Sequence, residues 1–249
     1  MKPILAALLL VPAAAHAQDA PLPPVRYPAI AEHAEDGPGF VPAGWTLEQS
    51  QSGDLNGDGL PDLALAFHQA DPHNVIKNEG GFCGDTIDTN PRILAVALAV
   101  PGGGYTLAMA NHSLVARYDA PCADDWFAED STGGGGITIE RGTLRVRLSY
   151  FMSAGGWSMG SRTFTFRWQQ DALRLIGFDY LDTQRNTGDL TTLSINFLTR
   201  KARIAHGTVE SDKEKVRWQT LPARAPLTID QIGDGADFDP DGLVGKLSG

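Results

Sequence analysis

The sequence predicts a mainly β protein: an antiparallel sheet built of successive hairpins, arranged as a sandwich or an open barrel, with little helix. The first observation is alternation, as at 143–152, where Leu144, Val146 and Leu148 share one face of a strand. The second is that glycine-containing turns such as 101–104 join neighbouring segments. The third is that only 228–232 has a helical pattern, and it is short.

Strand-length segments follow one another along most of the chain. The run at 92–100 is apolar without interruption, which predicts a central strand covered on both faces. The expected strands are 62–68, 92–100, 105–110, 137–140, 143–152, 163–168, 173–180, 193–197, 204–209 and 215–219.

The composition of the chain changes at three points. Residues 1–17 have the features of a secretory signal, with Lys2, an apolar run and a small-residue cleavage site ending at Ala17. Residues 18–44 form a proline-rich leader, expected to be extended and packed on the domain or partly disordered. A single β domain is expected at 45–225, and a short helix with an acidic tail at 226–249.

These features predict an exported protein, periplasmic or secreted. No later stretch of 18 residues is apolar throughout, so we expect no membrane span. The formal net charge of −10 argues against nucleic acid or an anionic membrane as partner. It is compatible with a protein or envelope partner, and it leaves the oligomeric state open.

The chain contains two cysteines, Cys83 and Cys122. In an exported protein such a pair most simply forms one disulfide. Closing a loop of this size would stabilise the fold by roughly 3–4 kcal/mol in the chain-entropy model. The alternative is a pair of buried, unpaired thiols.

The strongest chemical signal is the acidic loop at 53–66. It places side-chain oxygens at Asp54, Asn56, Asp58 and Asp62, and Leu60 can add its backbone carbonyl. Calcium takes six to eight oxygen ligands of this kind. The loop therefore predicts a structural calcium site that fixes the start of the following strand. The alternative is a metal-free turn whose side chains bond their own backbone.

The loop differs from an EF-hand in two respects. The twelfth position, where an EF-hand needs a bidentate glutamate, is Leu65, and the residues after the loop have a strand pattern. Gly59, at the sixth position, allows the sharp turn that such a loop needs.

The D-x-N-x-D-G-x-x-D-L pattern resembles the calcium loop of FG-GAP and VCBS-type repeats. The resemblance covers about 13 residues and implies that Asp54, Asn56, Asp58 and Asp62 are side-chain ligands. Those families build propellers from several copies, whereas this chain has one good copy, so the propeller is not implied. More loosely, the segments at 90–92, 166–179 and 194–202 resemble exported bacterial proteins with one such loop, which implies no activity.

A second acidic cluster copies the front of this loop at Asp237, Asp239 and Asp241. Its ninth position is Gly245, so one ligand is lost. A solvated acidic tail is the expectation, and a second ion site is the alternative.

A G-x-S-x-G pattern is centred on Ser158. In α/β-hydrolases this pattern follows a strand and precedes a helix. Asp179 or Asp182, followed by His206, would give the chain order of a catalytic triad, but the residues after Ser158 have a strand pattern. We expect a loop between antiparallel strands; a serine hydrolase would instead need His206 or His112 close to Ser158.

Among the tryptophans, Trp157 lies in a glycine-rich loop and is the best candidate for a binding anchor. Trp45 and Trp126 also have exposed-looking surroundings, whereas Trp168 and Trp218 are expected in the core. The leading hypothesis is an exported, calcium-binding, non-catalytic binding protein. One version of it is an inhibitor or immunity protein against an envelope-degrading enzyme; the alternatives are a serine hydrolase using Ser158 and a purely structural envelope protein.

Overall fold

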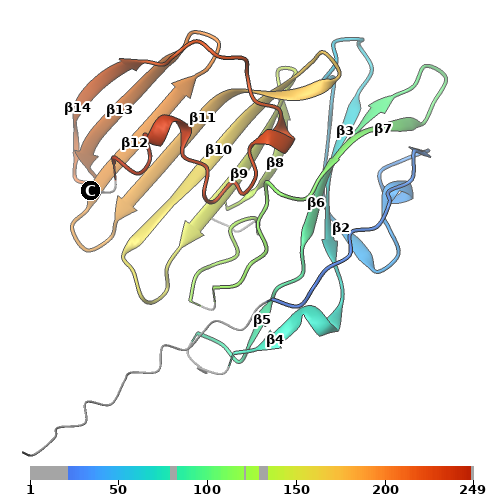
Figure 1. The fold of residues 1–249 in the computed structure, drawn as a ribbon, viewed down its shortest axis with the longest axis horizontal. Helices are drawn as coiled ribbons and strands as arrows, with labels where there is room; N and C mark the ends of the chain where they lie inside the picture. The colour runs from blue at the N-terminus through green and yellow to red at the C-terminus, as the bar shows by residue number, and fades with distance from the viewer. Residues whose placement is uncertain (1–21, 79–82, 121, 129–133, 248–249) are drawn as a thin grey trace, which may run out of the picture.

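The computed structural model describes residues 22–78, 83–120, 122–128 and 134–247. The predicted signal at 1–17 lies outside these residues. Two antiparallel sheets pack side by side, and the larger one curls into a half-barrel (Figure 1). The predicted mainly β class with little helix is confirmed.

Within the described residues, no helix is both long enough and apolar enough to span a membrane.

The smaller sheet has five strands. In spatial order these are β1 (His33–Ala34), β7 (Tyr105–Asn111), β6 (Arg92–Ala99), β3 (Asp62–Gln69) and β2 (Trp45–Gly53). The first six residues of both β3 and β6 are buried, because each is nearly continuously apolar and is covered on both faces. The predicted central strand is thus confirmed as β6.

The larger sheet has seven strands, each paired with its neighbour in the sequence. They are β8 (Gly136–Glu140), β9 (Thr143–Phe151), β10 (Ser158–Gln169), β11 (Ala172–Gln184), β12 (Asp189–Asn196), β13 (Lys201–Thr208) and β14 (Ser211–Thr220). Its inner face, defined here as the face that carries Phe164 and Phe178, faces the main core.

The smaller sheet lies between two apolar layers. Ala64 and Ala66 of β3 face the larger sheet and belong to the main core. Leu65 and Phe67, on the opposite face, pack in a second cluster with Phe40 of the N-terminal segment. The described part of the proline-rich leader therefore packs on the domain, and it contains β1 and the short 3-10 helix η1 (Pro38–Phe40).

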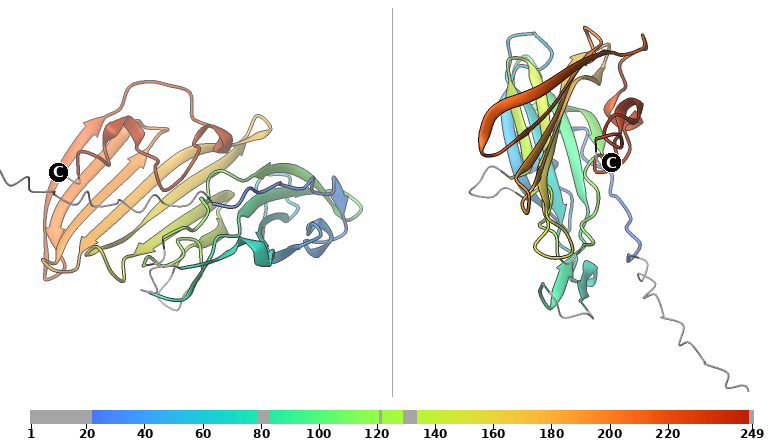
Figure 2. Two further views of the ribbon diagram at one scale, coloured as in Figure 1. Left: turned by 60° about the horizontal axis from the view of Figure 1, so that its bottom comes forward. Right: turned by 90° about the vertical axis from the view of Figure 1, so that its left-hand side faces the viewer.

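The C-terminal segment, residues 221–247, runs back across the inner face of the larger sheet (Figures 1 and 2). Phe238 packs against Phe164 and Phe178, with ring centroids 5.5 and 5.2 Å apart. Leu243 is buried in the same core. The aspartates of this segment remain largely exposed, as expected of an acidic tail, while the apolar residues between them hold the segment on the sheet.

The C-terminal segment contains two short 3-10 helices, η3 (Ile229–Gln231) and η4 (Pro240–Gly242). The first matches the predicted short helix, and a capping box between Thr228 and Gln231 begins it.

Several strands differ from the expectation. β10 and β11 extend beyond the predicted limits, and β1, β2, β4 (Val75–Lys77) and β5 (Thr86–Asp88) were not predicted. β2 forms an edge of the smaller sheet, and most of its side chains are polar, so the alternation that marks a half-buried strand is weak. β4 and β5 pair only with each other, over three residues.

The predicted disulfide between Cys83 and Cys122 is present, with Cα atoms 5.1 Å apart. It joins the segment between β4 and β5 to the long connection between β7 and β8. The disulfide thus ties down a long connection that has little regular structure of its own.

Candidate functional site

The acidic loop connects β2 to β3 and closes on its own backbone. Asp54 accepts hydrogen bonds from the backbone N–H groups of Gly57 (2.7 Å) and Gly59 (3.0 Å). Both glycines have φ of +85°, a conformation that favours glycine. Asn56 Oδ1 accepts from the N–H of Asp58 at 2.9 Å. The sequence thus folds locally as a series of side-chain-to-backbone turns.

Asp58 accepts two further hydrogen bonds, from the N–H of Leu60 (2.8 Å) and from Nδ2 of Asn56 (2.9 Å). The Leu60 hydrogen bond, together with that of Asn56, lowers the pKa of the Asp58 carboxyl below its ordinary value. Hydrogen bonds to the charged form have this effect because they stabilise the carboxylate. Asp58 therefore stays ionised at neutral pH while its side chain remains exposed.

Asp62 has a different position from the other predicted ligands. Its side chain is 0% exposed, and its Oδ2 accepts from the N–H groups of Leu55 (2.8 Å) and Asn56 (3.3 Å). Its Oδ1 accepts from the N–H of Ala99 at 2.9 Å. One buried carboxylate thus ties the loop, the start of β3 and the end of β6 together.

The side-chain oxygens of the loop are of the kind that calcium prefers as ligands. A carboxylate has about four lone-pair sites, so Asp54 and Asp58, which each accept two hydrogen bonds, retain acceptor capacity. Among the described residues, no group of three or more histidine, cysteine or carboxylate side chains is gathered tightly enough to hold a metal. The loop therefore supplies suitable oxygens, which in this structure bond the backbone.

The second acidic cluster is divided between two structural roles. Asp239 accepts from the N–H groups of Val244 (2.7 Å) and Gly245 (3.1 Å), and Asp241 forms an ion pair with Arg224. These contacts fasten the C-terminal segment.

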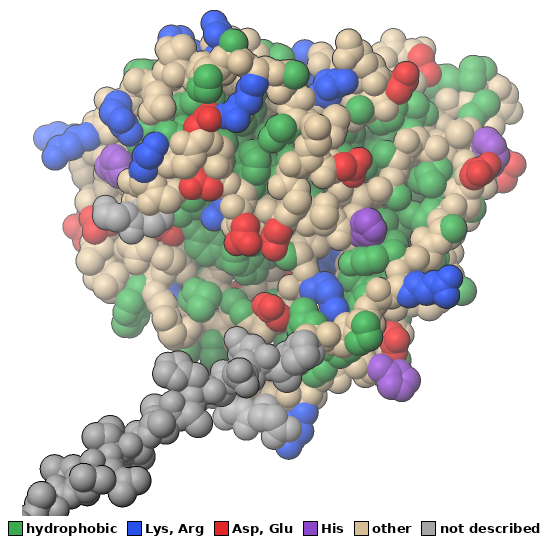
Figure 3. All heavy atoms as spheres, in the orientation of Figure 1, with side chains coloured by type: hydrophobic (Ala, Val, Ile, Leu, Met, Phe, Trp, Pro, Cys, Tyr) green, Lys and Arg blue, Asp and Glu red, His purple; other side chains and the backbone are tan. Residues whose placement is uncertain are grey.

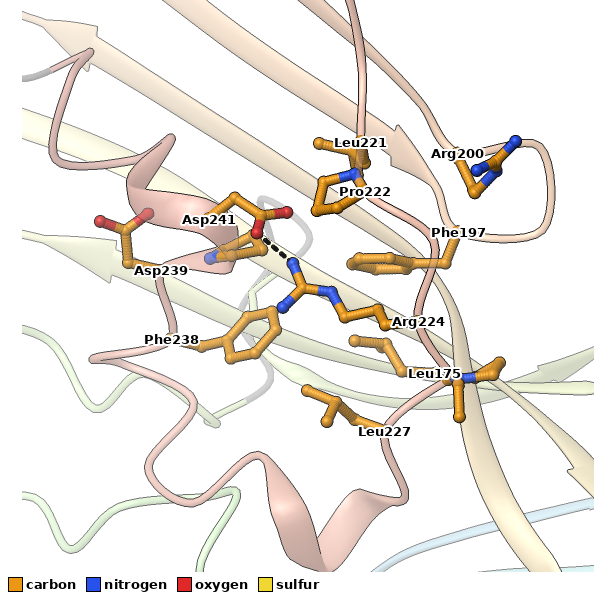
Figure 4. Close-up of a pocket in the computed structure, with 13 residues that line it drawn as sticks. Leu175, Phe197, Arg200, Leu221, Pro222, Arg224, Leu227, Phe238, Asp239 and Asp241 are labelled. Carbon is orange, nitrogen blue, oxygen red and sulfur yellow. Dashed lines mark ion pairs between the residues drawn. The ribbon is translucent and has the colours of Figure 1, made fainter.

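Figure 4 shows the Asp241–Arg224 pair beside a small cavity of about 130 Å³ under the C-terminal segment. Leu175 and Phe197 line it from the sheet side, and Phe238 lines it from the segment. Ligand pockets usually measure about 300–1,000 Å³. This cavity is thus a packing gap closed by an ion pair, too small for a ligand of ordinary size.

Ser158 lies at the start of β10, and its Oγ receives a hydrogen bond from Nε2 of Gln184 at 2.5 Å. His206 is on β13, three strand spacings or about 14 Å away, where it contacts Thr191 at 3.2 Å. His112, directly after β7 of the smaller sheet, contacts the ring of Tyr27 in the N-terminal segment, with centroids 4.2 Å apart. The described residues thus bring neither histidine to Ser158, and the geometry does not form a triad.

The second glycine of the G-x-S-x-G pattern, Gly160, lies within β10 opposite Asp182. Because it has no side chain, Tyr150 of β9 reaches across it and donates a hydrogen bond to Asp182 at 2.7 Å. A Cβ atom at Gly160 would clash with the carbonyl oxygen of Leu181 and lie 2.7 Å from the Tyr150 hydroxyl. The glycine thus serves packing within a sheet.

Trp157 is 59% exposed, directly before β10, and Arg185 fixes its surroundings. The backbone N–H of Arg185 donates to the Trp157 carbonyl at 2.9 Å, and its guanidinium donates to Met152 and Gly156. The guanidinium also lies over the Phe151 ring at 4.2 Å and near the Trp157 ring at 5.8 Å. An exposed indole is thus held in a pre-organised loop.

The other tryptophans were placed less well by the sequence. Trp45 is buried and Trp126 is half-buried against the main core, although both were expected to be exposed. Trp168 packs on the main core, as expected, whereas Trp218 is 64% exposed on the edge strand β14. Period-two alternation shows which side chains of a strand share a face. It does not show whether another layer of the protein covers that face, and at β14 no layer of the described residues covers Trp218.

A buried ion-pair network was not anticipated. Arg92, 3% exposed, donates to Glu48 at 2.6 and 2.7 Å and to Asp125 at 3.0 and 2.7 Å. Glu48 lies where the register of β2 shifts against β3, so a β-bulge turns its side chain toward Arg92. Asp125 comes from the long connection, so the network joins that connection to the smaller sheet.

The fold and site thus define a class: a mainly antiparallel β protein with a half-barrel sheet, one disulfide and an oxygen-rich loop. No family model matches the chain, and no curated protein or solved structure matches it. Its function therefore has to be inferred from its own residues.

Proposed function

We propose that this chain is an exported, non-catalytic binding protein that engages a protein or envelope component through Trp157. The observation that carries the proposal is the exposed indole of Trp157 on a backbone fixed by Arg185. Tryptophan is enriched among the residues that dominate binding energy. Holding it in place before binding reduces the entropy lost on association.

Two neighbouring features favour this surface. Met159, two residues further on, is 39% exposed and adds apolar area. Arg185 supplies a cation next to the ring, an arrangement suited to a mixed apolar and polar interface.

The disulfide is compatible with an oxidising compartment, which supports export.

Calcium is the second part of the proposal. The ligands would be the side chains of Asp54, Asn56, Asp58 and Asp62 with the carbonyl of Leu60, and the ion would brace the entry to β3. An ion that binds only the folded state stabilises it by about 2.7 kcal/mol at one hundred times its Kd. This role is structural and leaves the Trp157 surface as the site of recognition.

The calcium proposal is tested by thermal unfolding of the protein lacking residues 1–17, with calcium and with EDTA. We expect calcium to raise Tm in the wild type, and to have no effect in an Asp54→Asn/Asp58→Asn variant, which keeps one accepting oxygen at each position and loses two charges. Magnesium at the same concentration serves as the ionic-strength control. An unchanged Tm in the wild type would exclude the ion.

The binding proposal is tested by affinity capture from periplasm or medium, comparing wild type with Trp157→Ala. Loss of a central tryptophan typically costs more than about 2 kcal/mol, a thirtyfold weaker complex. Val100→Ala is a control, because Val100 is also exposed but lies just after β6, away from Trp157. A partner retained equally by wild type and Trp157→Ala would refute this surface. A captured envelope-degrading enzyme would favour the inhibitor version.

A further inference from the structure

The outer strand of the larger sheet, β14, offers a long open edge. It spans ten residues, Ser211–Thr220, and all of them except Gln219 are exposed. It pairs with β13 on one side, and no described strand pairs with its other side. About half of its backbone N–H and C=O groups therefore point away from the sheet, which makes the edge a template for another strand.

The side chains of β14 are sorted by charge between its two faces. Lys213, Lys215 and Arg217 alternate along the strand and share the inner side of the sheet, because Arg217 lies opposite Ile204, which belongs to the main core. Lys and Arg side chains gather over β13 and β14 in the space-filling view (Figure 3). This basic row lies on a protein whose net charge is −10.

The opposite side of the same strand carries apolar surface. Trp218 is 64% exposed, and Val216, two residues before it, is 45% exposed. The two are separated by one residue, so they stand side by side on one face. The edge therefore combines an open backbone, a basic row and an apolar pair.

A second copy of this chain does not suit the edge. When two β14 strands pair in antiparallel fashion, the inner faces of both copies lie on the same side of the joined sheet. The two basic rows would then lie next to each other. Pairing centred on Lys215, for example, sets Lys213 opposite Arg217 of the other copy. Like charges directly opposite each other destabilise a sheet, so the row disfavours self-pairing.

We propose that β14 binds an extended acidic segment of another protein as an eighth strand of the sheet. Acidic side chains of that segment would face Lys213, Lys215 and Arg217, and alternate apolar side chains would cover Val216 and Trp218. Only a peptide can complete the backbone ladder, and alternating side chains give such strand addition its specificity. This surface is distinct from Trp157, since β10 and β14 are four strand spacings apart, about 19 Å.

The test uses a capped ten-residue peptide of alternating glutamate and valine, with binding to the protein lacking residues 1–17 measured by calorimetry and amide exchange. We expect binding that weakens with salt, and slower exchange at alternate amides of β14. Lys213→Glu/Lys215→Glu should weaken binding at least tenfold and gain affinity for the lysine–valine peptide. Arg26→Glu/Arg141→Glu changes the same charge elsewhere and should bind as the wild type does.

Other outcomes would overturn the proposal. These are no binding by the wild type, equal binding by the charge-reversed variant, or binding without slower exchange in β14. Dimerisation through β14, seen in sedimentation, would assign the edge to a second copy. Binding of heparin or anionic vesicles but not the peptide would assign it to another polyanion. Trp157→Ala should bind the peptide unchanged, which separates this surface from the one proposed above.

Discussion

Replacing Arg92 by methionine should destabilise the fold strongly. Methionine has a similar length and no charge, so the change removes four hydrogen bonds, two to Glu48 and two to Asp125, while largely keeping the buried volume. Burial would lower the pKa of the Arg92 guanidinium, but the hydrogen bonds and charges of the two carboxylates raise it above its ordinary value. The side chain is therefore a permanent cation at the centre of this network.

The expected magnitude follows from what remains in the variant. Glu48 and Asp125 stay close together, 22% and 27% exposed, without the cation between them. Removing one partner of a buried ion pair costs about 3–5 kcal/mol. At about 2–4 °C per kcal/mol for a chain of this size, Tm should fall by roughly 6–20 °C.

The assay is chemical and thermal unfolding followed by circular dichroism. A triple variant, Arg92→Met with Glu48→Gln and Asp125→Asn, removes the unpaired charges and should recover part of the loss. Arg141→Met is the control, since Arg141 is exposed and its pairing with Glu140 at 3.7 Å contributes little. A loss below about 1 kcal/mol in Arg92→Met would refute the reasoning, because that is the size of an exposed ion pair.

Three further predictions concern stability. Gly160→Ala should cost about 3 kcal/mol or more in urea unfolding, because the added methyl overlaps the next strand and the Tyr150 hydroxyl; a cost near zero would contradict the described packing. Burial raises the pKa of Asp234, so its contribution to stability is present below its ordinary pKa and lost as pH rises through the folded value. Asp234→Asn should therefore raise Tm at pH 7 and leave it unchanged near pH 3, and the opposite order would exclude the effect. Replacing Cys83 and Cys122 by serine should cost about 3–4 kcal/mol, and a Tm insensitive to reducing agent in the wild type would argue against the disulfide.

The hairpins of the larger sheet were predictable from sequence because each strand alternates and each turn contains residues suited to it. β9 is the clearest case, with Leu144, Val146 and Leu148 all buried on one face. The central strand β6 was predictable for the opposite reason, its unbroken apolar run. These patterns are local, so they can be recognised in the sequence without knowing which strands pair.

The features that were missed depend on contacts between distant residues. The meeting of Glu48, Arg92 and Asp125 requires a bulge in one strand and a long connection folded back on it. The order of strands decides whether an alternating strand is covered, which is why Trp218 was misplaced. The loop residues Asp54 to Asp62 were found because the spacing of their oxygens is itself the signal.

The C-terminal segment, which closes the inner face of the larger sheet, has a consequence for the order of folding. Phe164 and Phe178 are covered by Phe238, which lies sixty residues further along the chain than Phe178. During synthesis the larger sheet would leave the ribosome with this aromatic surface exposed to water. The surface can be buried only after the C-terminal segment has also been synthesised. Until the C-terminal segment is synthesised, the nascent chain exposes apolar surface that chaperones can bind, and it is more prone to aggregate than the folded protein.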